Sequence, residues 1–165
     1  MNGVSVPRWL ALLLASLAWL VAIPLAHGVL PWAISLLTHR YEWIEERPGT
    51  WNLLGIIYVA LGAALLIWVF FVSIAQTPQR VKLGLTPSIL MVRGPYVFTR
   101  NPMYVAEVGI WLGWAIFFGS IGVFAAAVVL WAVVNFVILP REEHTLEAVF
   151  GQVYFQYKDR TRRWL

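Results

Sequence analysis

The sequence predicts an all-α integral membrane protein with about four transmembrane helices, and two features of its composition lead to this fold class. Of the 165 residues, 61% are hydrophobic and 12% are charged, against roughly 45–50% and 25% in soluble domains. A soluble domain of this length has too little interior to bury so much apolar surface. The charges are also segregated, because nineteen of the twenty lie outside three long apolar blocks and only Glu107 lies inside one. Lipid must therefore cover much of the chain.

The first apolar block covers residues 9–37. As one straight helix it would measure about 44 Å, more than a hydrocarbon core of about 30 Å. Because Pro24, Gly28 and Pro31 interrupt it, we predict a span over residues 9–26, followed by a short bent segment that lies at the membrane surface or re-enters the membrane. A cleaved signal peptide is the alternative, although this apolar run exceeds the usual ~7–15 residues.

The other two blocks supply the remaining spans. Residues 51–74 are uncharged and long enough for one span. Residues 103–139 are long enough for two, and the pair Gly119-Ser120 predicts a very tight turn between them. We therefore predict a tight helical hairpin of spans 103–118 and 121–139.

Small residues indicate how the helices of this hairpin pack. Gly109 and Gly113 are four residues apart and form a small-xxx-small face on the first helix. Such a face lets two helix backbones approach closely. We expect it to pack against the alanine run at residues 125–127.

The basic residues predict the orientation in the membrane. The loop 76–102 and the tail 140–165 carry nine of the lysines and arginines, whereas the loop 38–50 has two arginines beside three glutamates. By the positive-inside rule, the loop 76–102 and the tail are cytoplasmic. Four spans then place both termini in the cytoplasm. The net charge of +4 requires no nucleic-acid partner, since basic segments next to a membrane meet anionic lipid headgroups.

The loop before residue 103 carries the densest polar signal. Gly94-Pro95 predicts a turn, and Pro102 suits the first turn of the following helix. Arg100 just ahead of a helix amino terminus makes a site for a carboxylate or phosphate. From these residues alone, the loop is either an anion site or a basic segment bound to lipid headgroups.

The tail adds a second polar cluster, in which the acidic pair Glu142-Glu143 follows Pro140-Arg141 and aromatic and basic residues come after. Loop and tail together resemble the isoprenylcysteine carboxyl methyltransferase and phospholipid methyltransferase superfamily of integral-membrane enzymes. The resemblance covers about residues 88–165. The matching residues are Gly94-Pro95-Tyr96, Arg100-Asn101-Pro102-Met103-Tyr104, Glu142-Glu143, Leu146, Phe150-Gly151, Tyr154, Tyr157 and Arg163-Trp164.

This resemblance implies a cytoplasmic pocket for S-adenosylmethionine, formed by the loop and the helical tail, with a lipid-like or small apolar methyl acceptor. The expected cofactor-binding residues are Leu90, Met91, Gly94, Tyr96, Arg100, Asn101, Pro102, Met103, Tyr104 and Glu142, with the segment from Ser88 to Met91 beside the site. The expected catalytic residues are Glu107, Glu143 and Arg141. A metal is not expected, and the chain contains no cysteine that could ligate one or act as a thiol nucleophile.

Two departures from the family pattern leave the acceptor open. Asn101 stands where the family usually has His, and an amide cannot titrate. Val137-Ile138 occupies the region where prenylcysteine enzymes carry an Arg for the substrate carboxylate, for which Arg141 is the nearest substitute. A carboxylate, an amine or a thiol therefore remains possible, and only an ammonium acceptor requires a general base. Candidates for that base are His144, Glu143, Tyr104 and Glu107.

Two other functions compete with methyl transfer. Membrane reductases of the sterol type resemble this chain in the Arg100–Tyr104 segment and the aromatic tail, and they would use NADPH. A non-enzymatic membrane protein with a lipid-binding basic face is the second alternative.

Overall fold

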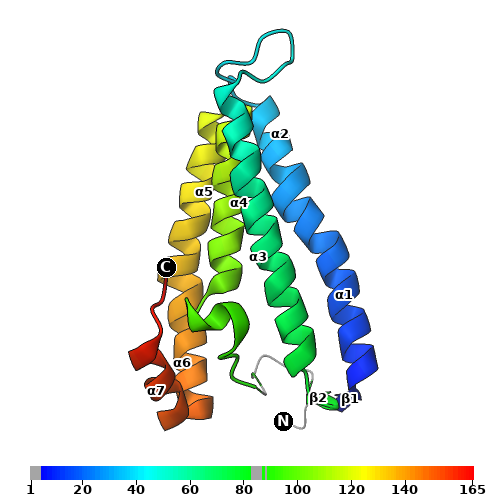
Figure 1. Cartoon of the computed structure of the whole chain (residues 1–165), viewed down its shortest axis with the longest axis vertical. Coiled ribbons are helices and arrows are strands. Elements are labelled where there is room, and N and C mark those ends of the chain that lie inside the picture. Colours follow the sequence, from blue (N-terminus) through cyan, green and yellow to red (C-terminus); the bar gives the residue numbers. More distant parts are fainter. Residues whose placement is uncertain (1–4, 83–86, 88) are drawn as a thin grey trace.

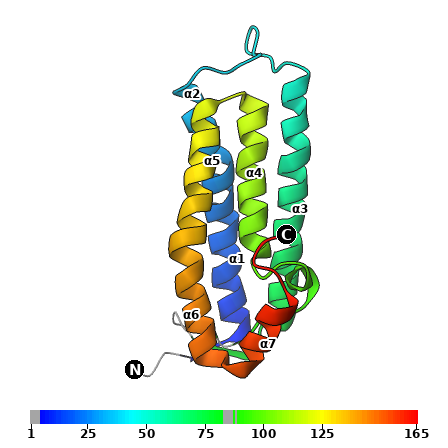
Figure 2. The same cartoon turned by 90° about the vertical axis from the view of Figure 1, so that its left-hand side faces the viewer.

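A computed structural model of the chain describes residues 5–82, 87 and 89–165. Long helices run along one common axis, and the loop at residues 37–50 closes one end of the bundle (Figures 1 and 2). We call the opposite end, where the short strands and the last two helices lie, the basal end. The elements are β1 (Ser5–Pro7), α1 (Arg8–Pro24), η1 (Leu25–Val29), α2 (Leu30–Leu36), η2 (Trp51–Leu53), α3 (Leu54–Gln76), β2 (Arg80–Lys82), η3 (Gly94–Val97), α4 (Pro102–Phe118), α5 (Ile121–Val133), η4 (Val134–Ile138), α6 (Leu139–Phe150) and α7 (Gln152–Arg160).

The helices account for the apolar blocks of the sequence. Among the described residues, three continuous helices are long and apolar enough to cross a membrane: Arg8–Leu36, Trp51–Gln76 and Ile121–Phe150. The helix α4 is apolar but has only 17 residues, about 26 Å at 1.5 Å per residue. The predicted all-α class is confirmed, apart from a two-stranded ribbon of β1 and β2. A count of four spans stays a prediction.

Two prolines that interrupt the apolar pattern do not end their helices. The first helix continues past Pro24 to Leu36, and the last continues past Pro140 to Phe150. Each passes through one π-helical turn next to its proline, η1 after Pro24 and η4 before Pro140. Such a turn changes the hydrogen-bond register locally, so that a proline without an N–H group is accommodated as a bend. The first eleven residues of the predicted tail thus extend the last helix.

The hairpin of α4 and α5 forms as predicted, with a different packing face. Gly119 adopts a left-handed conformation with φ of 56°, and the Ser120 side chain caps α5 by accepting from the Val123 N–H at 3.2 Å. Gly113, however, packs against Gly55 of α3, where a Cβ on either glycine would overlap backbone atoms of the other helix. The expected contact with the alanine run is therefore wrong for Gly113. A Cβ on Gly109 would meet nothing within 4 Å.

The buried core between α4 and α5 explains why Gly113 faces α3. Trp111, Ala115 and Phe118 of α4 pack with Val123 and Ala127 of α5 in one buried cluster. The bulky side chains of Trp111 and Phe118 fill this interface together with small ones, and Gly113 is left to face α3. The helix α4 is consequently held at the centre of the bundle, and its amino terminus points toward the basal end (Figure 1).

Candidate functional site

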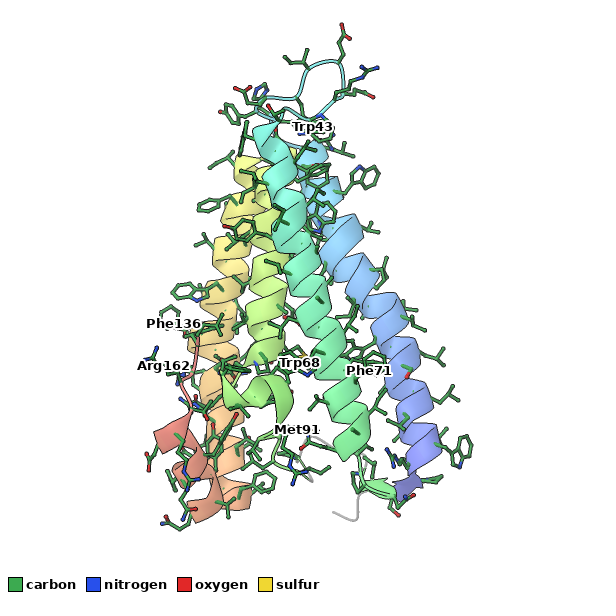
Figure 3. All side chains as sticks on the ribbon, in the orientation of Figure 1. Trp43, Trp68, Phe71, Met91, Phe136 and Arg162 are labelled. Carbon is green, nitrogen blue, oxygen red and sulfur yellow. The ribbon has the colours of Figure 1, made fainter. Side chains whose placement is uncertain are left out.

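A cavity of about 540 Å³ lies at the basal end, between the segment before α4 and the helices α6 and α7. We call it the basal cavity. Met91 and Arg162 mark this end of the bundle in Figure 3. The residues that line the basal cavity are Pro87, Ile89, Leu90, Met91, Tyr96, Arg100, Asn101, Arg141, Glu142, Glu143, Thr145, Leu146, Tyr154 and Tyr157. The volume is within the range of small-molecule sites, about 300–1,000 Å³.

The segment before α4 is held in place from both sides. Gly94 has φ of 64°, a conformation that favours glycine, and starts the single turn η3 against Val72 of α3. On the other side, the Arg100 N–H donates to the Arg162 carbonyl at 2.8 Å. The side chains of Thr99 and Asn101 both donate to the Arg163 carbonyl at 2.9 Å. The last residues of the chain are thereby fastened to the loop, which fixes one wall of the cavity.

Glu143 joins three parts of the site through ion pairs. Its Oε1 lies 3.2 Å from Arg100 Nη1, and its Oε2 lies 2.6 Å from Arg163 Nη2. The side chains of Glu143 and Arg100 are each 11% exposed, so this pair is largely shielded from water. The carboxylate of Glu143 raises the pKa of Arg163 through its hydrogen bonds. A carboxylate held by two guanidinium groups is well placed to position Arg100.

Arg100 also carries an unmet hydrogen-bonding group. Within the described part of the chain, its buried Nε has no hydrogen-bond partner. A buried donor without a partner costs about 1–3 kcal/mol. Because Arg100 lines the basal cavity, an acceptor group of a ligand would remove this cost.

Glu142 is the second acidic group of the cavity and has a different environment. Its side chain is exposed, and its Oε1 accepts from the Tyr104 hydroxyl at 2.7 Å. This contact is the link between α4 and α6 at the cavity edge. Since a carboxylate has about four lone-pair sites, Glu142 keeps capacity to accept from a ligand.

Tyrosines form the aromatic part of the wall. The Tyr157 hydroxyl donates to the Tyr96 carbonyl at 2.7 Å, which joins α7 to η3. Burial raises the pKa of Tyr96, Tyr154 and Tyr157. These phenols are therefore neutral at physiological pH, and each hydroxyl keeps its proton, which in Tyr157 is already donated to the Tyr96 carbonyl.

The structure brings most of the predicted site residues to this cavity. Eight of them line it, namely Leu90, Met91, Tyr96, Arg100, Asn101, Arg141, Glu142 and Glu143. Tyr104 is joined to it through Glu142. Three others serve nearby: Gly94 packs on α3, Pro102 starts α4, and Met103 lines a neighbouring cavity. Ser88 lies outside the described residues.

Glu107 lies apart from the basal cavity lining. Its Oε1 is 3.9 Å from Nε2 of His27 on η1, and His27 Nδ1 accepts from Trp111 Nε1 at 3.1 Å. Glu107 therefore belongs to a polar contact between the first helix and α4. Sequence reasoning passed over His27, although an imidazole within an apolar block is itself a signal.

Other residues of the cavity were also missed as site residues. Tyr154, Tyr157 and Leu146 line it, and Arg163 holds Glu143. All four belong to the tail pattern that carries the resemblance, and the spacing of Tyr154 and Tyr157 places them on one face of a helix. This spacing was the sequence signal that could have identified the two tyrosines as site residues.

Taken together, the long apolar helices indicate an integral membrane protein, and a partly polar cavity lies at one end of its bundle. The model of the phospholipid methyltransferase family matches residues 51–153. The chain belongs to this family, which indicates a membrane methyltransferase. The match begins at η2 and ends in α7, so that it includes most of the basal cavity and excludes the first helix.

Comparison with individual proteins adds one relative. An uncharacterized protein of Haemophilus influenzae is 35% identical over 63 residues, which are 38% of this chain and the whole of that protein. No solved structure matches the chain. Among the described residues, no group of three or more His, Asp and Glu side chains could hold a metal ion.

Proposed function

We propose that the protein is an S-adenosylmethionine-dependent methyltransferase that acts on an apolar or lipid-like acceptor at the membrane. The observation that carries the proposal is the basal cavity, whose lining combines the charged side chains of Arg100, Arg141 and Glu142 with apolar ones that include Leu90 and Met91. The family match supports the class of reaction. The cofactor has the same mixture of charged and flat apolar groups.

The residues of the cavity fit the groups of this cofactor. Arg100, whose buried Nε has no partner among the described residues, would take the carboxylate. Glu142 would accept from the ammonium or the ribose hydroxyls. The ring of Tyr96 and the side chains of Leu90 and Met91 would flank the adenine or the sulfonium.

Little proton chemistry is required of the protein in this reaction. The cofactor supplies a methyl group already activated on a sulfonium, so the protein residues position the acceptor in line and exclude water. In this scheme Glu143, held by two arginines, is a positioning residue, and Arg141 remains at the cavity wall for an anionic group. A carboxylate or thiolate acceptor then needs no base. An ammonium acceptor would have to lose its proton first.

We also propose that the basal end faces the cytoplasm. The arginines and lysines of the tail lie at that end, whereas the loop with Glu42, Glu45 and Glu46 lies at the other (Figure 1). This distribution agrees with the positive-inside rule. It places the cavity where a water-soluble charged cofactor is available.

Transfer of a labelled methyl group tests the proposed reaction. Membranes that contain the protein, incubated with S-adenosylmethionine carrying a tritiated methyl group, should accumulate label in the solvent-extracted lipid fraction. Membranes with the Glu142→Gln variant serve as the control. Release of the label by mild base would indicate a methyl ester, and a base-stable headgroup would indicate an amine. Label no higher than in membranes that lack the protein would contradict the proposed activity.

A further inference from the structure

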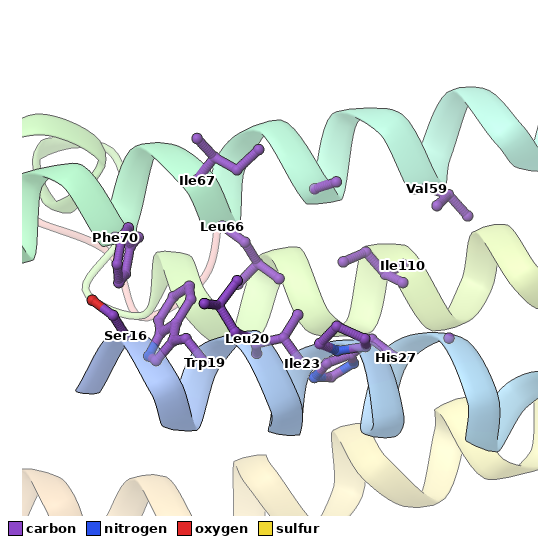
Figure 4. A pocket seen from close by; sticks show the side chains of 13 residues that line it. Ser16, Trp19, Leu20, Ile23, His27, Val59, Leu66, Ile67, Phe70 and Ile110 are labelled. Carbon is purple, nitrogen blue, oxygen red and sulfur yellow. The ribbon is translucent and has the colours of Figure 1, made fainter. Parts of the chain in front are cut away.

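The basal half of the first helix packs loosely against the rest of the bundle. The helix α1, which the structure describes throughout, has no buried residue, whereas α3 and α4 pack closely on each other. A cavity of about 520 Å³ lies between α1 and α3, and the two helices diverge toward the basal end (Figure 1). In Figure 4, His27 and Val59 lie at one end of this cavity, and Ser16 and Phe70 lie at the other. Interlocking side chains hold a helix rigidly in a protein core, and α1 contributes no buried side chain to such a core.

Two indole groups fasten the first helix at the end of this cavity that lies farther from the basal end. Pro31 has no N–H group, so it cannot give the α-helical hydrogen bond to the carbonyl of His27, four residues earlier. The indole Nε1 of Trp114 donates to this carbonyl instead. Trp111 donates to Nδ1 of the His27 imidazole at 3.1 Å, and Trp111 itself belongs to the buried cluster of α4 and α5. The first helix is therefore anchored at His27 to the core of the bundle.

The anchor lies inside the π-helical turn η1, which has the features of a hinge. Pro24 precedes this turn and Pro31 follows it, and the Leu30 N–H donates to the Leu25 carbonyl, five residues back. Helices bend at prolines and at such turns. Gly28 lies in the same turn, and a Cβ built on it would meet no described atom within 4 Å. Because a hinge is a short segment that absorbs changes in φ and ψ, η1 is the place where α1 can change its angle to the bundle.

At the basal end, α1 is held by one charged side chain and a short ribbon. The guanidinium of Arg8 donates to the Ile74 carbonyl at 2.9 Å, in the last turn of α3, where carbonyl groups lack partners within the helix. The helix dipole also favours a cation at this end of α3. The strand β1 leads directly into α1 and pairs with β2, which follows α3 after residues 77–79. The ribbon is thus joined to α1 directly and to α3 through a link of three residues.

We propose that α1 is a hinged arm, which turns about η1 while its anchor at His27 stays fixed, and that Arg8 is the latch that holds its basal end near α3. The motion changes the width of the cavity between α1 and α3. It leaves the basal cavity intact, because none of the described residues that line that cavity belongs to α1. The inference goes beyond the proposed function and does not depend on it.

Distances between paired spin labels test this motion. Because the sequence contains no cysteine, two labelled cysteines can be introduced without other changes. The basal pair, Leu13→Cys and Phe71→Cys, joins the basal ends of α1 and α3. The reference pair, Leu36→Cys and Ile57→Cys, joins the first helix to α3 on the other side of the hinge. All four side chains are exposed, and the distances are measured by pulsed electron paramagnetic resonance in lipid nanodiscs.

The basal pair should give a broad or two-peaked distance distribution, and the reference pair should give a single narrow peak. Arg8→Gln removes the charge of the latch and should shift the basal distribution to longer distances, with the reference pair unchanged. The control is Arg47→Gln, at an exposed arginine of the loop at the other end of the bundle, which should leave both distributions as they are. Narrow single peaks for both pairs, unchanged by Arg8→Gln, would overturn the hinged arm.

Two glycines with open surroundings provide a matched test of the hinge itself. A Cβ on Gly28 or on Gly109 would meet no described atom within 4 Å, so alanine fits at both positions. Alanine restricts the backbone more than glycine does. Gly28→Ala in η1 should therefore narrow the distribution of the basal pair, whereas Gly109→Ala in α4 should leave it unchanged. The same distribution in both variants would show that α1 does not turn about η1.

Discussion

Replacing Glu143 by Gln should destabilise the protein by about 3 kcal/mol, the lower end of the cost of breaking a buried ion pair. The substitution keeps the shape of the side chain and removes its charge, so that the ion pairs of Glu143 with Arg100 and Arg163 are lost. We place the effect at the lower end because Arg163 is 35% exposed and water screens it in part. The readout is thermal unfolding of the purified protein in detergent.

A second acidic residue of α6 provides the control for this experiment. Glu147 forms an ion pair with Lys158 at 2.6 Å, and both side chains are about 30% exposed. Glu147→Gln should cost less than about 1 kcal/mol. Glu143→Gln should also release the residues after Thr161 to trypsin sooner, because Arg163 is a main contact of that segment. Equal thermal shifts in the two variants would show that Glu143 does not hold the site together.

Replacing Glu142 by Gln should weaken cofactor binding about ten- to hundredfold. This is the loss of one hydrogen bond to a charged group, about 1.5–3 kcal/mol. Glu142 is exposed, and its one hydrogen bond among the described residues is to Tyr104, so the thermal midpoint without ligand should hardly change. The measurement is a calorimetric titration with S-adenosylhomocysteine. Arg100 is less suitable for this test, since its substitution would also disturb Glu143.

Tyr104→Phe is the matched control for Glu142→Gln. It removes the hydroxyl that contacts Glu142 and keeps the carboxylate itself. The affinity for the cofactor should therefore fall only slightly, through the loss of one contact that positions Glu142. We expect the affinity of Glu142→Gln for S-adenosylhomocysteine to be far below that of Tyr104→Phe. The affinity of Tyr104→Phe should be near that of the wild type. The same affinity in wild type and Glu142→Gln would mean that the cofactor does not contact this carboxylate.

The sequence predicted the helices well because the membrane excludes charged residues from the segments that cross it, so that the apolar blocks mark the helices. It did not foresee that the first helix continues past Pro24, where a π-helical turn carries the helix on. A proline signals only that one N–H is missing. Whether the chain bends or stops there depends on what the next turn packs against, which periodicity does not contain.

The candidate site was likewise predictable from the sequence only in part. The meeting of loop and tail residues in one cavity was predictable, because the family resemblance implied a site formed by both segments. The ion pair between Glu143 and Arg163 spans 20 residues of the chain and was not predictable from spacing. Asn101 illustrates a substitution that geometry explains, since its amide donates to the Arg163 carbonyl at 2.9 Å, a role that needs no titratable group.

Binding of S-adenosylhomocysteine compared with NADPH tests the central claim most directly. For a ligand at a hundred times its Kd, binding stabilises a folded protein by about 2.7 kcal/mol. We expect thermal unfolding of the purified wild-type protein to move upward with S-adenosylhomocysteine and to stay unchanged with NADPH. A shift with NADPH and none with millimolar S-adenosylhomocysteine would contradict the methyltransferase assignment and favour a membrane reductase.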